Sequence, residues 1–145
     1  MTKARQVARP GFPIARVLLV DADLTSRLTL QTILQAGGYR VDAAASAAEA
    51  VGKLEKAEYE LVLSDLQMES PEAGLKVLAH ARMMEYKPAT ALITTYRDSK
   101  RRPTANKSGQ TVLIEPEDLP ELLGKVAELI SERATRKVER ELRHA

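Results

Sequence analysis

The 145-residue sequence has no cysteine, only 3% aromatic residues and no run of about eighteen apolar residues, the length that a membrane span needs. Without cysteine the chain can form no disulfide framework, no thiolate metal site and no thiol nucleophile. Residues 1–13 carry basic side chains but lack the apolar core of a signal peptide. These absences predict a cytoplasmic protein without a membrane segment, and the length predicts one domain that needs no disulfide or metal to fold.

Basic side chains gather in three segments, 1–16, 97–107 and 131–145. These segments hold fourteen of the 22 Lys and Arg residues but only four of the 20 Asp and Glu residues. The rest of the chain therefore has a net charge near −8. Solvated extensions are the favoured explanation, and an acidic partner is the alternative. A nucleic-acid-binding adaptor that uses the basic arm and the 97–107 loop is less favoured, because these segments lack regularly interleaved aromatic residues and base-reading motifs.

Short apolar segments alternate with segments of helical periodicity along the rest of the chain. Strands are expected at 15–20, 39–43, 60–65, 90–94 and 111–114. Helices are expected at 25–36, from 46, from 74 and from about 118. Apolar runs bounded by polar residues are typical of strands buried on both faces. The alternation therefore predicts an α/β fold with a parallel sheet.

Three of the expected helix ends carry recognisable signals. Ser46 and Glu49 stand in the capping-box relation at one start. Gly37-Gly38 supplies a left-handed stop. Asp118 precedes the last helix, with Pro120 in its first turn, where the missing N–H costs nothing.

Polar residues stand at the carboxyl ends of four of the strands. Asp21 follows the first, Asp65 ends the third, Thr94 ends the fourth and Glu115 follows the fifth. In open α/β sheets these ends meet at a crevice where ligand chemistry gathers. Asp65 is therefore a functional candidate, although an Asp that caps a helix or holds a loop is equally common at such a position.

In order and spacing these motifs resemble the receiver domain of two-component response regulators. The match covers about residues 15–130 and includes Asp65 with the following Gly74-Leu75, and Glu115-Pro116 at the last strand. The resemblance implies a flavodoxin-like, doubly wound, five-stranded parallel sheet of order 2-1-3-4-5. It divides the chain into a basic N-terminal arm (1–14), a receiver domain (15–130) and a charged extension of the last helix (131–145).

The resemblance also implies a set of site residues. Asp65 matches the carboxylate that takes a phosphoryl group from a histidine kinase. Asp21, Asp65 and the backbone carbonyl of Gln67 match the ligands of a divalent metal, usually magnesium, which prefers oxygen ligands. Thr94 matches the hydroxyl that contacts the phosphoryl oxygens.

Two positions depart from the family pattern. Ala22 replaces the second of the usual acidic pair, and Glu115 replaces the usual lysine. Asp23 could reach the metal, but capping of the following helix is the favoured role. Two unit charges about 4 Å apart interact by roughly 4 kcal/mol at an effective dielectric of about 20, so Glu115 is expected to impair phosphorylation severely. A site of Asp21, Asp65 and Glu115, with or without Asp23 and with no basic partner, could instead hold a divalent cation directly or keep one carboxyl group protonated. A pocket that binds no ligand is the remaining alternative.

The output face also differs from the family pattern. Residues 97–108 contain Pro103 and one apolar residue, Ala105, so the family's fourth helix is expected to be degraded to a loop. In the continuation of the last helix, a narrow apolar stripe of Ile130, Ala134, Val138 and Leu142 could pair with another helix or with a second subunit in a homodimer. A solvated helix with intrahelical ion pairs is an equally good explanation of that stripe.

The sequence therefore predicts an atypical receiver domain that acts mainly as a protein-interaction module of a two-component phosphorelay. Its partners would be a histidine kinase or a downstream effector, its magnesium site would be weakened, and it would not be an enzyme. The alternative within the family is a working magnesium-dependent receiver that is phosphorylated on Asp65.

Overall fold

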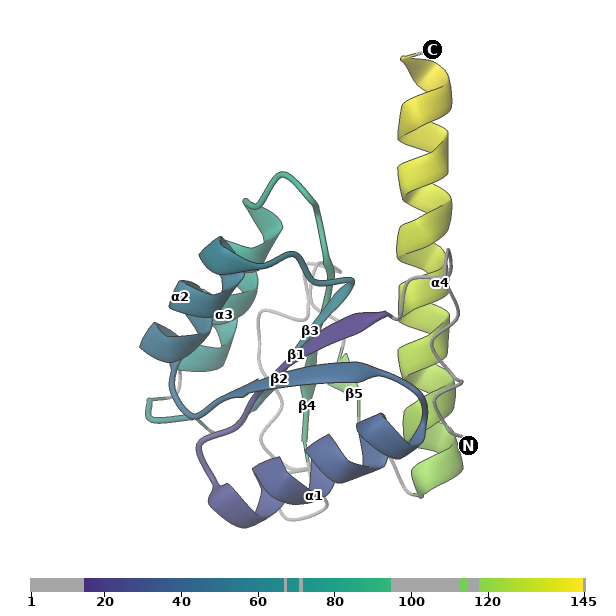
Figure 1. The fold of residues 1–145 in the computed structure, drawn as a ribbon. Helices are drawn as coiled ribbons and strands as arrows, with labels where there is room; N and C mark the ends of the chain where they lie inside the picture. The colour runs from purple at the N-terminus through teal and green to yellow at the C-terminus, as the bar shows by residue number, and fades with distance from the viewer. Residues whose placement is uncertain (1–14, 67, 71, 95–112, 115–117, 145) are drawn as a thin grey trace.

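The computed structural model describes residues 15–66, 68–70, 72–94, 113–114 and 118–144, which form a parallel sheet between two layers of helices (Figure 1). The strands are β1 (Arg16–Val20), β2 (Arg40–Ala44), β3 (Leu61–Asp65), β4 (Ala89–Ile93) and β5 (Leu113–Ile114). The helices are α1 (Leu24–Ala36), α2 (Ala47–Lys56), α3 (Ala73–Arg82) and α4 (Leu119–Arg143). All pairings are parallel and the strand order is β2-β1-β3-β4-β5. The predicted α/β class and strand order are confirmed.

Each central strand is buried on both faces, which explains its uninterrupted apolar sequence. Along β1, Val17 and Leu19 face one core, which α1 and α4 cover, while Leu18 and Val20 face a second core under α2 and α3. The same alternation continues along β3. The central strands β1 and β3 are thereby covered by helices on both faces of the sheet.

The residues predicted to start and end helices adopt the expected capping conformations and hydrogen bonds. Ser46 Oγ accepts a hydrogen bond from the Glu49 N–H at 3.1 Å, and Glu49 Oε1 accepts one from the Ala45 N–H at 2.8 Å. Gly38 ends α1 at a φ of 100°, a conformation that favours glycine. Asp118 accepts a hydrogen bond from the Glu121 N–H at 2.8 Å at the start of α4. The capping box, the glycine stop and the last N-cap are therefore all confirmed.

A polar cluster joins the amino edge of the sheet to the loop before β3. Asp42 Oδ2 accepts hydrogen bonds from Arg16 Nη2 at 3.0 Å and from the Tyr59 hydroxyl at 2.7 Å. The Arg16 guanidinium also lies 5.3 Å from the centre of the Tyr59 ring. Burial alone would raise the pKa of Asp42, but its bonds to Tyr59 and Arg16 outweigh burial and lower that pKa.

Replacement of Asp42 by asparagine should lower the free energy of unfolding at neutral pH by about 1 kcal/mol, because charge-assisted hydrogen bonds become neutral ones. The folded-state pKa lies below the ordinary value of 3.8, so the ionised carboxylate stabilises the fold above that value. This contribution is lost as the pH falls through the folded-state pKa. Urea unfolding across the acid range should therefore show a shallower loss of stability in Asp42→Asn. Parallel curves for the variant and the wild type would contradict this assignment.

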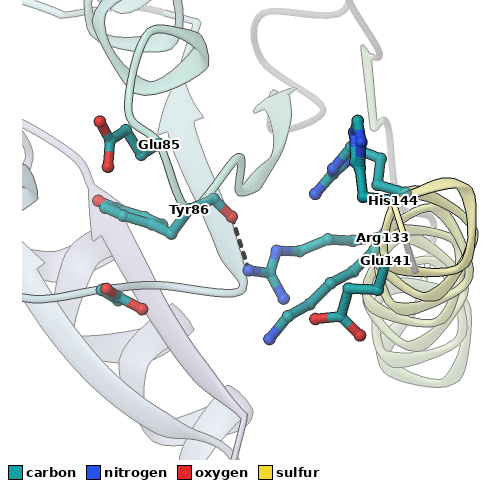
Figure 2. A pocket seen from close by; sticks show the side chains of 8 residues that line it. Glu85, Tyr86, Arg133, Glu141 and His144 are labelled. Carbon is teal, nitrogen blue, oxygen red and sulfur yellow. Dashed lines mark hydrogen bonds between the residues drawn. The ribbon is translucent and has the colours of Figure 1, made fainter.

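Helix α4 packs on the sheet through its first half, with Leu122 and Val126 in the core, and its second half projects past the body of the domain (Figure 1). Between the two halves lies Arg133, only 8% exposed. Its Nε donates to the Lys87 carbonyl at 3.0 Å. Its Nη2 donates to the Tyr86 carbonyl at 2.7 Å (Figure 2). Arg133 thereby ties α4 to the turn between α3 and β4.

No helix in the described part of the chain combines the length and the apolar character that a membrane span requires.

Candidate functional site

Three polar side chains are buried together at the carboxyl edge of the sheet. Asp21 directly follows β1, Asp65 is the last residue of β3, and Thr94 directly follows β4. Their exposures are 1%, 8% and 2%. Buried polar groups are costly unless they find partners, so a cluster of this kind at the strand ends is a candidate functional site.

Asp21 and Asp65 lie side by side, because β1 and β3 pair in parallel with Val20 opposite Ser64. Burial raises the pKa of Asp21, while hydrogen bonds from the Asp23 N–H, at 2.9 Å, and with the Asp65 side chain partly oppose that rise. Two carboxyl groups can share a hydrogen bond only if one of them is protonated. Burial thus remains the dominant influence on Asp21, and its pKa stays above the ordinary value of 3.8.

A basic group that the sequence analysis missed lies beside this pair. Arg27, on the first turns of α1, donates from Nη1 to the Asp21 carbonyl oxygen at 2.9 Å, and its charge lowers the pKa of Asp21. Arg27 therefore adds a positive charge near Asp21 that the sequence analysis did not consider. The signal that could have revealed Arg27 is its spacing of four residues from Asp23, which places it one turn along α1 from the N-cap.

Asp23 acts as the N-cap of α1. Its Oδ2 accepts a hydrogen bond from the Ser26 N–H at 2.9 Å, and its backbone is extended. This agrees with the favoured interpretation of Asp23 from the sequence. The carboxylate that the sequence considered as an additional metal ligand is thus engaged with the helix backbone.

Position 74, in the first turn of α3, has room only for glycine. A Cβ atom at this position would lie 2.9 Å from the carbonyl oxygen of Asp65 and 3.2 Å from Ser64 Oγ. The first turn of α3 therefore approaches the end of β3 more closely than any other residue type would allow. The glycine of the Gly-Leu pair is therefore required by packing against the end of β3.

Replacement of Gly74 by alanine should lower the free energy of unfolding by about 1–3 kcal/mol, since the new methyl group meets a backbone oxygen that cannot rotate away. Gly52 in α2 is the matched control, because a Cβ there has no neighbour within 4 Å. Gly52→Ala should raise stability by roughly 0.5–1 kcal/mol through helix propensity. Urea unfolding measures both variants. Equal effects of the two substitutions would contradict the proposed close approach.

Several predicted residues lie outside the described part of the chain. These are Gln67, Glu115, the basic arm 1–14 and the segment 97–108 expected to replace the fourth helix. Among the residues that the structure describes, no group of three or more His, Cys, Asp or Glu side chains is arranged to hold a metal ion. The described site thus contributes two carboxylates and one hydroxyl.

Comparison with known proteins agrees with this geometry. The family model for the response regulator receiver domain matches residues 17–127. The transcriptional regulatory protein ZraR of Klebsiella oxytoca is 30% identical over 107 residues, which are 73% of this chain and 24% of that regulator. The chain therefore spans about a quarter of that relative's length.

Solved structures are similar over most of the chain. A CheY-like response regulator receiver domain protein from Methanospirillum hungatei superposes with a TM-score of 0.72 at 25% identity, covering 86% of this chain and 99% of that one. The response regulator TrrA from Thermotoga maritima, solved in complex with Mg²⁺-BeF, has a TM-score of 0.65 at 26% identity and covers 80% of this chain and 99% of its own.

Proposed function

The chain belongs to the response regulator receiver domain family, and from this premise we propose that it is an atypical receiver whose phosphorylation is impaired. It acts mainly as a protein-interaction module in a two-component phosphorelay. Asp65 is its phosphoacceptor position, and Thr94 and Glu115 are the positions that would face the phosphoryl group.

The main support for the proposal is that Asp21, Asp65 and Thr94 are all buried at the same edge of the sheet. This arrangement preserves the nucleophile, one acidic neighbour and the hydroxyl. Ala22 supplies no carboxylate and Asp23 is occupied as a helix cap. With glutamate in place of lysine at position 115, the positive charge that would hold a phosphoryl oxygen is reversed in sign.

Magnesium fits the donor chemistry of this site only in part. Asp21, Asp65 and the carbonyl of Gln67 would hold the ion, and Mg²⁺ commonly binds proteins through one or two carboxylates with water completing its shell. When bound, the ion would neutralise negative charge at the phosphoryl group. The loss of the second acidic position supports a weakened affinity.

Exposed apolar side chains next to the site support a role in partner binding. Leu24 and Leu28 lie one turn apart on α1, are 59% and 52% exposed, and follow closely after Asp21. A kinase or effector helix that packed on this pair would also reach the acidic edge of the sheet. Val138 and Leu142 on the projecting half of α4 offer a second apolar surface, which supports homodimer formation through the last helix.

The test is phosphoryl uptake from acetyl phosphate in the presence of Mg²⁺, followed by the mass of the intact protein. We expect at most a minor phosphorylated fraction, and none in Asp65→Asn. A wild-type protein that becomes largely phosphorylated, with the change abolished in Asp65→Asn, would instead establish the alternative of a working magnesium-dependent receiver.

A further inference from the structure

Two hollows flank the projecting half of α4. The larger, of about 620 Å³, lies between this helix and the turn around Tyr86 (Figure 2). Its lining combines three basic side chains with three carboxylates, those of Glu58, Glu85 and Glu141, and with His144. The balance of charge in this hollow gives no preference for an anionic or a cationic ligand.

The second hollow, of about 390 Å³, has a different character. Four cationic side chains line it against one carboxylate, that of Glu132. The cations are Arg82 at the end of α3, Lys87 in the following turn, and Arg136 and Arg140 on α4. Apolar groups of Pro88, Ala89 and Leu129 lie among them. We call this surface the basic hollow.

Much of the positive charge of the basic hollow is directed to solvent. Lys87 Nζ donates one hydrogen bond to the Arg82 carbonyl at 3.2 Å, which leaves two of its three donors for other groups. Neither Arg136 nor Arg140 forms an ion pair with a described residue. Arg133 fixes the helix that carries both arginines against the turn that carries Lys87.

We propose that the basic hollow is a docking site for an acidic polypeptide segment that carries one apolar side chain among its carboxylates. Arginine forks pair well with carboxylates, and the partly exposed Leu129, next to the buried Pro88 and Ala89, provides an apolar contact for the neighbouring side chain. None of the described residues that line the hollow is aromatic, so this part of the surface offers no platform on which nucleic-acid bases could stack. Charge complementarity and the apolar floor therefore favour a protein segment.

This docking site goes beyond the proposed function because it lies at the opposite end of the sheet from the acidic pair. Ala89 at the start of β4 pairs with Leu61, whereas Ile93 at its end pairs with Asp65. Four residues of strand separate the two edges by about 13 Å. A partner bound in the basic hollow would leave Asp65 and the exposed face of α1 accessible.

The experiment measures fluorescence anisotropy with a labelled peptide of alternating Glu and Asp residues around one central leucine. Reversal of charge in Arg136→Glu with Arg140→Glu should weaken binding at least about tenfold, because like charges then oppose the peptide. Arg143→Glu is the control on the same helix, with half of the charge change of the double variant, since Arg143 lines neither hollow. It should change affinity by less than about threefold.

Further probes separate the possible ligands. Replacement of the central leucine of the peptide by serine should weaken binding several-fold, roughly as expected for the loss of one partly buried apolar side chain. Asp65→Asn should bind the peptide as the wild type does, so that failure of this inference is distinguishable from failure of the proposed function. Equal loss in Arg143→Glu, or tighter binding of a single-stranded oligonucleotide than of the peptide, would overturn the proposal.

Discussion

Replacement of Glu115 by lysine should increase the affinity for beryllium fluoride with Mg²⁺ by at least about tenfold, and by up to about a thousandfold. A charge about 4 Å from the phosphoryl position contributes roughly 4 kcal/mol at an effective dielectric of about 20, and about 1.4 kcal/mol corresponds to a factor of ten. The lower bound applies if the glutamate side chain of the wild type turns toward solvent. Beryllium fluoride mimics an acyl phosphate on Asp65, so its affinity measures the stability of the phosphorylated state without a kinase.

The control for the change in net charge is Glu85→Lys, at an exposed residue in the turn between α3 and β4, which lies at the opposite end of the sheet from Asp65. This substitution changes the charge of the protein equally but not next to the phosphoryl position. It should leave the affinity within about threefold of the wild-type value. If Glu115→Lys also has little effect, residue 115 does not limit phosphorylation, and the alternative of a working receiver gains support.

Replacement of Arg133 by alanine should lower the free energy of unfolding by about 2–4 kcal/mol. The substitution removes two hydrogen bonds from a charged donor, each worth up to about 1.5–3 kcal/mol, and leaves the Tyr86 and Lys87 carbonyls without these donors. Lys87 holds a φ of 47°, an unfavourable value for a residue other than glycine, and loses the partner that fixes this turn. Urea unfolding gives the difference directly.

Arg136→Ala is the matched control, because Arg136 is exposed on the same helix. It should change stability by less than about 0.5 kcal/mol. Arg133→Ala should also weaken peptide binding to the basic hollow, since the position of Arg136 and Arg140 depends on the contact between α4 and the turn. Equal effects of the two substitutions on stability would show that Arg133 does not anchor α4.

The sequence predicted the elements and their order because two-sided burial leaves a simple pattern. The runs at Val17–Val20 and Leu61–Leu63 are apolar throughout, and the capping signals at Ser46 and Asp118 act within one turn of the chain. The closeness of Asp21 and Asp65 followed from the rule that parallel strand ends share an edge. Local pattern and sheet topology together were therefore sufficient for the fold and for the acidic pair.

The sequence could not predict contacts between distant segments. Arg133 appeared to be one charge among several on a basic helix, and its burial depends on carbonyl groups 46 and 47 residues earlier in the chain. The role of Gly74 likewise depends on how closely α3 approaches β3. The basic hollow combines residues of α3, the following turn and α4, which no periodicity connects. Such features arise from tertiary packing alone.

The most direct test of the account is an amide NMR titration of the wild type and Asp65→Asn, first with Mg²⁺ and then with beryllium fluoride. An impaired switch predicts weak responses to Mg²⁺ near Asp21 and Asp65, and no saturable response to beryllium fluoride at concentrations that would saturate an ordinary receiver. Saturable shifts at Asp65 and Thr94 that disappear in Asp65→Asn would contradict the central claim, and would show that the site is a working phosphoacceptor despite Glu115.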